Sequence, residues 1–187
     1  MKVTTLDALL LFLVSHKAQS GYDIRQLIQS TPLGIFSDSP GAIYPALARL
    51  EARGLLTSEA EAGGRRKRAY LRTEAGDREL RVWLRKPVDL DTVTRRPQEL
   101  DLRHTLLAQV LGRAAAMDFA HACAKLETQY LAEVEAFQAG PGQAMDRASQ
   151  ESVDLGLRLI RTRLQWRREV LSTGRDDAED ERALVDR

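Results

Sequence analysis

The chain lacks the features that disulfide-stabilised and membrane-spanning proteins need. It has one cysteine, Cys123, among 187 residues, so no disulfide can form within a single chain. This favours a reducing compartment. Its longest apolar run, 8–14, is far shorter than the roughly 20 residues that cross a bilayer. Asp7 directly precedes that run, which argues against a secretory signal. We therefore expect a cytoplasmic protein.

The chain also lacks the residue groupings of an active site or a metal centre. Its three histidines, His16, His104 and His121, show no ligand spacing. His121 and Cys123 are two positions apart, so on a helix they point to different faces. The sequence has no Ser/His/Asp set, metal motif or phosphate-binding loop. Cys123 lies on an apolar stripe, where a buried thiol is favoured over a redox sensor. We expect neither an enzyme nor a bound cofactor or metal.

Aromatic residues are few, at 5%, whereas apolar residues make up 43% and charged residues 29% of the chain. This mixture is typical of a mainly helical, soluble protein. Residues 1–86 hold 14 Lys and Arg against 9 Asp and Glu, a net charge of +5; the other residues hold 14 against 18, a net charge of −4, which gives the total of +1. A basic first half and an acidic second half indicate a nucleic-acid-binding unit joined to a part with another role.

A helix is predicted over 39–53. At about 100° per residue, Ile43, Leu47 and Leu50 fall on one face, which we expect to face the core. Pro45 would cost about 3 kcal/mol in a helix interior. We therefore expect the helix to begin near Gly41 and to hold Pro45 in its first turn.

The opposite face of this helix is the candidate DNA-reading surface. Its residues are small: Gly41, Pro45, Ala48 and Ala52. Small side chains let the backbone approach another surface closely. Tyr44 and Arg49 flank this face and can reach phosphates or base edges in a major groove. An ordinary amphipathic helix with a solvent-exposed face is the alternative.

Two short strands, predicted at 55–60 and 69–72, follow the helix and enclose a basic turn. Gly63 and Gly64 supply the positive-φ positions that a tight connection needs. Four positive charges come next: Arg65, Arg66, Lys67 and Arg68. Such a run is often only a solvated loop. Its place on a hairpin directly after a candidate recognition helix favours contact with DNA phosphates. The hairpin then forms the wing of a winged helix-turn-helix.

The segments before this helix complete the fold. Helices are predicted over 4–14, where Thr4 and Asp7 have capping-box spacing, and over 21–30. The turn of the helix-turn-helix then occupies 33–38.

Two anchoring features are expected around the wing. Phe36 should hold the turn before the recognition helix against the core. After the wing, Thr73 caps a further helix, which Pro87 ends. Its apolar stripe consists of Leu80, Trp83 and Leu84.

The second half is also predicted to be helical. Residues 87–97 are polar and bounded by prolines, which predicts a linker. Three helices are expected after it: 98–111, 114–139 and 143–172. The last two form a hairpin around the Gly-Pro-Gly turn at 140–142, and Thr173-Gly174 closes the second of them. The segment 175–187 is dense in charge, and we expect a disordered tail.

The helix over 143–172 has more apolar surface than a hairpin within one chain requires. A seam close to a heptad repeat consists of Met145, Ala148, Ser152, Leu155, Leu159, Thr162, Trp166 and Val170. Leu157, Ile160 and Leu164 add apolar surface beyond it. A partner chain could bury the surplus, and the candidate dimerisation residues are Leu155, Leu159, Ile160 and Trp166. Packing of the surplus against 98–111 in the same chain is the alternative.

Several motifs in the first 86 residues occur in the order and at the separations of one known family. They are Gly-Tyr-Asp-Ile at 21–24, the stretch 41–51, Gly-Leu-Leu at 54–56, the basic segment 64–70 and Thr-Glu-Ala-Gly at 73–76. In these motifs the chain resembles the PadR family of transcriptional regulators. The resemblance implies a dimeric winged-helix DNA binder, usually a repressor, whose helical C-terminal region forms the dimer. Ala42 departs from the family, which usually has Ser there, so any hydrogen bond of that hydroxyl is missing.

We therefore expect a mainly α-helical, homodimeric transcriptional regulator, most simply a repressor. Residues 1–86 form the winged helix-turn-helix with a two-stranded wing, and 98–174 form the dimerisation and effector domain. The operator should be a roughly palindromic DNA duplex, and a small-molecule effector would change the geometry of the helical arms. The candidate DNA-binding residues are Tyr22, Ser39, Ala42, Tyr44, Pro45, Arg49, Arg65, Arg66, Lys67 and Arg68. The alternative is a winged helix used for protein contact, with the basic wing meeting an acidic partner.

Overall fold

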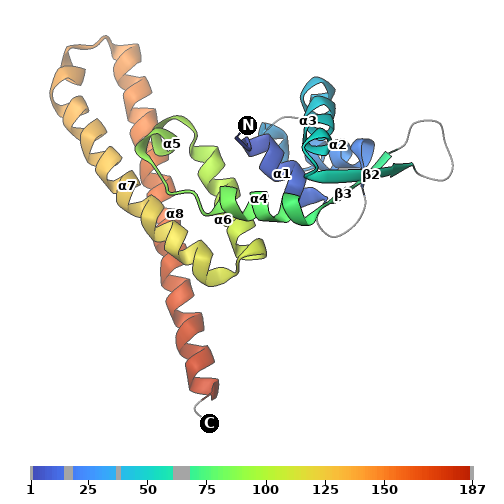
Figure 1. The fold of residues 1–187 in the computed structure, drawn as a ribbon. Helices are drawn as coiled ribbons and strands as arrows, with labels where there is room; N and C mark the ends of the chain where they lie inside the picture. Colours follow the sequence, from blue (N-terminus) through green and yellow to red (C-terminus); the bar gives the residue numbers. More distant parts are fainter. Residues whose placement is uncertain (1, 15–18, 37–38, 61–67, 186–187) are drawn as a thin grey trace. The chain divides into compact units, whose positions relative to one another are not determined.

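The computed structural model describes residues 2–14, 19–36, 39–60 and 68–185, of which Ala60 and 174–185 are described by their backbone alone. The chain divides into two compact units, Met1–Lys86 and Pro87–Arg187 (Figure 1). Within the described ranges the chain is mainly helical, and strands occur only in the first unit.

The first unit combines helices with a small sheet. Its elements are α1 (Thr5–Leu13), β1 (Gln19–Ser20), α2 (Gly21–Gln29), the 3-10 helix η1 (Pro32–Phe36), α3 (Pro40–Ala52), β2 (Leu56–Ala60), β3 (Arg68–Arg72) and α4 (Glu74–Leu84). α1 packs against both α3 and α4, and α2 packs against α3. The core consists of side chains with no exposed surface: Leu9, Leu10, Leu11, Ile24, Ile28, Ile43, Leu47, Leu50 and Leu80.

Side-chain caps determine where three of these helices begin. Thr4 and Asp7 form the predicted capping box. The Thr4 hydroxyl accepts a hydrogen bond from the backbone amide of Asp7 at 3.1 Å, and the Asp7 carboxylate accepts one from the backbone amide of Thr4 at 3.0 Å. Ser20 accepts a backbone amide at the start of α2, and Thr73 does the same at the start of α4. These caps satisfy donors that a helix start would otherwise leave unpaired.

The sheet has one strand more than the sequence predicted. Its order is β1-β3-β2, with both pairs antiparallel. β1 is only two residues long, too short to show the alternation of a strand, and it pairs with Tyr70 and Ala69. β3 is therefore the central strand of the sheet, and within the wing (β2, β3 and their connection 61–67) it is the strand that pairs on both sides.

α3 confirms the predicted core face, because Ile43, Leu47 and Leu50 have no exposed surface. The helix begins at Pro40, one residue before the expected start, so Pro45 is its sixth residue and not part of its first turn. Pro45 cannot donate the usual bond to the carbonyl four residues earlier, yet the helix continues for seven residues beyond it.

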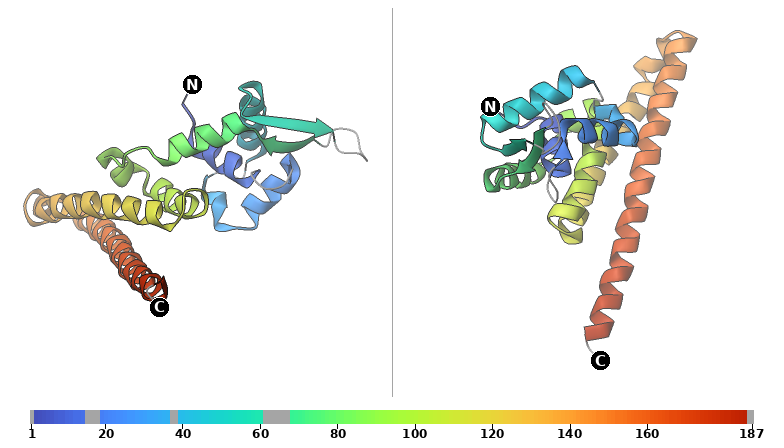
Figure 2. Two further views of the ribbon diagram at one scale, coloured as in Figure 1. Left: turned by 60° about the horizontal axis from the view of Figure 1, so that its bottom comes forward. Right: turned by 90° about the vertical axis from the view of Figure 1, so that its right-hand side faces the viewer.

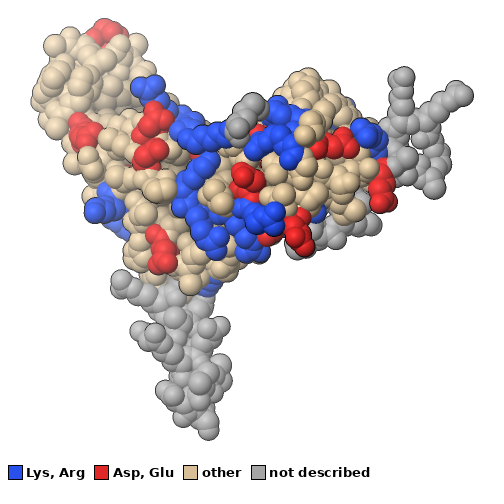
Figure 3. Space-filling view, in the orientation of Figure 1, with Lys and Arg blue, Asp and Glu red and all other residues tan. Residues whose placement is uncertain are grey.

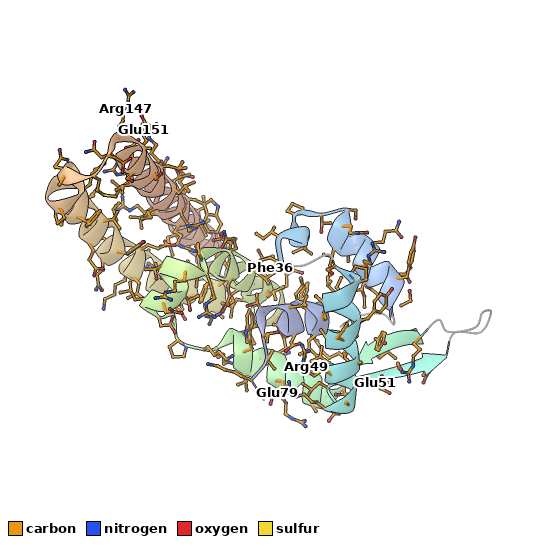
Figure 4. All side chains as sticks on the ribbon, turned by 90° about the horizontal axis from the view of Figure 1, so that it is seen from above. Phe36, Arg49, Glu51, Glu79, Arg147 and Glu151 are labelled. Carbon is orange, nitrogen blue, oxygen red and sulfur yellow. The ribbon has the colours of Figure 1, made fainter. Side chains whose placement is uncertain are left out.

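The turn before α3 differs from its predicted form. The structure has the 3-10 helix η1 there, and residues 37–38 lie outside the described part. Phe36, expected to be a core anchor, is only half-buried (Figure 4).

The second unit contains three long helices. Its elements are α5 (Leu90–Arg95), α6 (Pro97–Val110), α7 (Arg113–Ala139), the 3-10 helix η2 (Pro141–Ala144) and α8 (Arg147–Val185). α7 packs against α6 and forms the predicted hairpin with α8 (Figure 2). None of the helices in the described ranges has the length and apolarity needed to cross a membrane.

Two parts of this unit differ from the sequence predictions. The expected linker, 87–97, contains α5, which begins where the Asp89 carboxylate accepts the Thr92 amide at 2.7 Å. α5 packs against α6 and α7, so the segment is part of the unit. α8 does not end at Thr173-Gly174 but continues to Val185, through the stretch expected to be a disordered tail. That stretch has no proline, and its Arg, Glu, Ala and Leu residues favour helix, although Asp does not.

A buried ion pair joins three helices of the second unit. Glu127, a charged residue one turn after Cys123 on the apolar stripe of α7, accepts a 2.7 Å hydrogen bond from Nε of the fully buried Arg167 in α8. Arg167 also donates from Nη2 to Asp101 of α6 at 3.3 Å. Cys123, one turn before Glu127, is fully buried as predicted, and burial raises the pKa of its thiol to about 11.

The two apolar sets of α8 differ in burial. Leu157 and Leu164 are buried within the chain, and Ile160 is half-buried between them. These are the residues that the sequence suggested as surplus. The heptad seam is instead exposed at Leu155, Leu159 and Trp166. The hairpin is therefore closed without the seam.

Candidate nucleic-acid interface

Helix α3, the candidate recognition helix, presents a face of small residues beside Tyr44. Gly41, Pro45 and Ala48 are exposed, on the side away from the buried core face. Tyr44 is 42% exposed, and a Cβ at Gly21 would lie 2.7 Å from its ring. Tyr44 therefore packs over the first residue of α2, where a larger side chain would displace its ring. Tyr22, the next residue of α2, is also exposed, at 55%.

The N-terminal end of α3 holds two further candidates. Ser39 is the N-cap residue, in extended backbone conformation, and it is exposed. Ala42 is half-buried, one turn before the core residue Ala46. The first turn of a helix directs backbone amides outward, an arrangement that suits phosphate oxygens.

Arg49 takes part in an ion pair that the sequence did not reveal. Its Nη2 lies 2.5 Å from Oδ1 of Asp7 in α1, and that carboxylate is fully buried. The Arg49 side chain is 33% exposed. The pair joins the recognition helix to α1, 42 residues away in the chain. Arg49 thus has a structural partner in addition to its predicted place at the DNA-reading face.

Glu51, which sequence reasoning did not single out, connects α3 to both wing strands. Its Oε1 accepts a 2.6 Å hydrogen bond from Oγ of Ser58 in β2, and its Oε2 lies 3.2 Å from Nη1 of Arg68 in β3. In Figure 4, Arg49 lies toward α1 and Glu51 toward the wing strands. The two neighbouring charged residues of α3 therefore bind it to different parts of the unit.

Tyr70 lies at the base of the wing, in the central strand. Its side chain is buried, and burial, followed by the nearby negative charge of Glu51, raises the pKa of its phenol. Tyr70 therefore stays neutral at physiological pH.

The basic part of the wing is described only at its end. Arg65, Arg66 and Lys67 lie outside the described residues, so their contact with DNA stays a prediction. Arg68 is described, and its side chain is 58% exposed although it pairs with Glu51.

Other positive charges of this unit are paired along α4. The Asp77 carboxylate lies 2.5 Å from Nε of Arg81 and 2.8 Å from Nη2 of Arg72. The hydrogen bond from Arg81 lowers the pKa of Asp77. Arg72 also donates to the backbone oxygen of Leu11 at 3.2 Å. In Figure 3, Lys and Arg side chains accordingly lie beside Asp and Glu on this unit. A group of three or more His, Cys, Asp or Glu that could hold a metal does not occur in the described part of the chain.

Comparison with known proteins places the likeness in the first unit. Residues 10–82 match the model of the PadR-like family of transcriptional regulators. The chain is 40% identical over 70 residues to "Transcriptional regulator Rv3488" of Mycobacterium tuberculosis (strain ATCC 25618 / H37Rv); the match covers 37% of this chain and 65% of that protein. It therefore spans less than two thirds of that relative's length.

The solved structures that this chain matches include PadR proteins. The crystal structure of Bacillus subtilis PadR in complex with operator DNA is 22% identical, with a TM-score of 0.42, over 91% of this chain and 99% of that chain. The PadR-like transcriptional regulator BC1756 from Bacillus cereus is 20% identical, with a TM-score of 0.40, over 93% of this chain and 99% of that chain. The family match extends from α1 to α4 and includes α3 and both wing strands, so it covers most of the first unit.

Proposed function

We propose that this protein is a sequence-specific DNA-binding transcriptional regulator that acts as a homodimer, most simply as a repressor. The observation that carries the proposal is the construction of α3. One face of the helix is fully buried, the other presents small exposed residues flanked by Tyr44, and the wing follows directly. A helix built in this way can lie in a major groove while the wing reaches the neighbouring backbone.

The proposed contacts fall into two groups. Tyr22, Tyr44 and the first turn of α3 at Ser39 would contact base edges and phosphates of the major groove. The wing residues Arg65, Arg66 and Lys67 would contact phosphates beside it, which adds affinity without sequence preference.

The proposed dimer surface is the exposed seam of α8. Leu155 and Leu159 are 58% and 56% exposed, and Trp166 lies on the same side of the helix. Large apolar side chains aligned at heptad spacing are the usual interface of a second helix. Because Leu157, Ile160 and Leu164 already pack within the chain, the seam is available for a second copy. Two reading heads related by a dimer axis would bind a roughly palindromic operator.

Regulation is the last part of the proposal. A small molecule or partner bound to the C-terminal unit would change the separation of the two reading heads and release the operator. A compound that acts in this way should weaken operator binding, and by thermodynamic reciprocity the operator should weaken binding of the compound equally.

The deciding experiment is selection of duplexes from a random pool by the full chain. Binding of the selected duplex and of a scrambled duplex of equal composition is then measured over a range of salt concentrations. We expect a partly palindromic selected sequence, tighter binding to it, and a steep fall of affinity with salt. If no sequence is enriched and duplex binding is weak, the winged helix serves another purpose, such as contact with an acidic protein.

A further inference from the structure

The two wing strands have an inner and an outer face. In the β2–β3 ladder, Ser58 lies opposite Tyr70, and Arg68 is two residues from Tyr70 in β3. Side chains alternate along a strand, so Ser58, Tyr70 and Arg68 share one face. Tyr70 is buried on that face. The outer face is exposed at Thr57, Glu59 and Leu71. Arg68 thus begins on the inner face of the hairpin, the face toward α3.

On that inner face, the Glu51 carboxylate is hydrogen-bonded to both wing strands. Each of its carboxylate oxygens has its own partner: Oε1 accepts from Ser58 at 2.6 Å, and Oε2 accepts from Arg68 at 3.2 Å. The Glu51 side chain is only 26% exposed, whereas the Arg68 side chain is 58% exposed. One side chain of α3 therefore fixes the positions of β2 and β3 at the point where the wing leaves the body of the unit.

We propose that Glu51 is a positioning residue for DNA recognition, which acts by holding the wing at a set place relative to α3 through Ser58 and Arg68. This inference rests on the proposed DNA-binding function. When the wing is already held at a fixed position relative to α3, DNA binding does not have to restrict the motion of one element relative to the other. This preorganisation lowers the entropy cost of binding and so increases affinity. The gain is greatest on the operator, where base contacts require one geometry, and least on DNA that is bound loosely through its phosphates.

A different role for the same pair makes the opposite prediction. In this alternative, Arg68 could contact a DNA phosphate, but its ion pair with Glu51 prevents the contact. Removal of the Glu51 charge would then strengthen binding to every duplex. Removal of Arg68 would then weaken binding to every duplex and lower the slope of log affinity against log salt by about 0.9.

The experiment compares Glu51→Gln, Arg68→Met and their double variant in the full chain. Glutamine keeps the shape of Glu51 and a polar group for Ser58 but removes the charge that binds Arg68. Methionine keeps an apolar stem at Arg68 without its charge. The matched control is Glu59→Gln, which removes the same charge from the exposed outer face of the same hairpin. The probes are the duplex selected by the parent protein and its scrambled counterpart.

We expect Glu51→Gln and Arg68→Met each to lower the ratio of selected to scrambled affinity by about fivefold or more, comparable to the loss of one base-edge contact. The salt slope should stay unchanged, Glu59→Gln should keep the parent ratio, and the double variant should resemble either single variant. Circular dichroism and urea unfolding should find all variants folded at the binding temperature, because an exposed pair contributes little stability. An unchanged ratio in a folded Glu51→Gln variant, or tighter binding to both duplexes, would overturn the proposal. If the parent itself prefers no duplex, the proposed function fails instead.

Discussion

Nη2 of Arg49 in the recognition helix α3 donates a 2.5 Å hydrogen bond to the fully buried carboxylate of Asp7 in α1. The other oxygen of Asp7 accepts the amide of Thr4 and completes the capping box of α1. One buried carboxylate thus determines where α1 begins and how α3 lies against it. A buried charge that loses its partner is costly, so the pair fixes the position of the helix proposed to read DNA.

The first prediction concerns the stability that this pair provides. Arg49→Met should lower the free energy of unfolding by about 1–3 kcal/mol, less than a fully buried pair would because Arg49 is partly exposed. Asp7→Asn should also destabilise, and the double variant should cost less than the sum of the two. Urea unfolding, with hydrogen exchange of the α1 and α3 amides to locate the change, measures these values. If the losses of unfolding free energy in the two single variants simply add up in the double variant, Arg49 and Asp7 are not coupled.

The second prediction concerns the basic wing. Changing Arg65 and Arg66 to Ala should weaken binding to selected and scrambled duplexes about equally, because phosphate contacts carry no sequence information. Each lost contact should lower the slope of log affinity against log salt by about 0.9. Binding titrations at several salt concentrations test this. A slope equal to that of the parent would mean that these arginines do not contact the backbone.

The third prediction concerns Tyr44, whose ring packs over Gly21. Tyr44→Phe should keep this packing and lose a hydrogen bond to DNA, so we expect weaker operator binding with unchanged stability. Tyr44→Ala should also lower the free energy of unfolding, since it removes the ring from α2. If both variants bind the selected duplex like the parent, Tyr44 serves only to pack α3 against α2.

The sequence predicted the helices of this chain better than the contacts between them. Apolar spacing identified the core face of α3, and the Thr4–Asp7 spacing predicted a capping box, because both depend on residues close together in the chain. The pairing of Arg49 with Asp7 spans 42 residues, and that of Glu51 with Arg68 spans 17. No local pattern encodes such contacts, so the sequence indicated the DNA-reading face but not what holds it in place.

The same limit explains the errors in the second half. Two apolar stripes on α8 were recognised, but which one faces α7 depends on the partner helix and not on α8 itself. The helix α5, and in the first unit the strand β1, were missed because they have only six and two residues, too few for a periodic pattern. Glu127 broke the stripe of α7 for a reason that lies 40 residues away, at Arg167.

The fourth prediction concerns pH. Burial, followed by the positive charge of Arg167, lowers the pKa of His104 below its ordinary value of 6.5. The unfolded chain therefore takes up this proton more readily than the folded chain. The contribution of His104 to stability is fully present above about pH 6.5 and is lost as the pH falls below it. His104→Gln should flatten the decline of the unfolding free energy between about pH 7.5 and about pH 5. An identical decline in both proteins would contradict this assignment.

The last prediction concerns the proposed dimer surface on α8. Leu155 and Leu159 are exposed and stand one turn apart, beside Trp166, whose ring contacts His104 edge-on with centroids 5.3 Å apart. Introducing a charge at Leu155 and Leu159 should split a dimer that buries them, because a charge without a partner is costly to bury. Ile160 is a poor site for this test, since it is half-buried on the side that packs within the chain.

The test is Leu155→Asp combined with Leu159→Asp, studied by sedimentation and circular dichroism. The control is Gln165→Asp with Ser172→Asp, which adds the same two charges to exposed positions of α8 away from the seam. We expect the seam variant to be a folded monomer that loses operator affinity by orders of magnitude, because one half-site provides too few contacts. The control should remain a dimer with parental affinity. A seam variant that stays dimeric would place the interface elsewhere, and a folded monomer that binds the whole operator as tightly as the parent would show that dimerisation does not determine affinity.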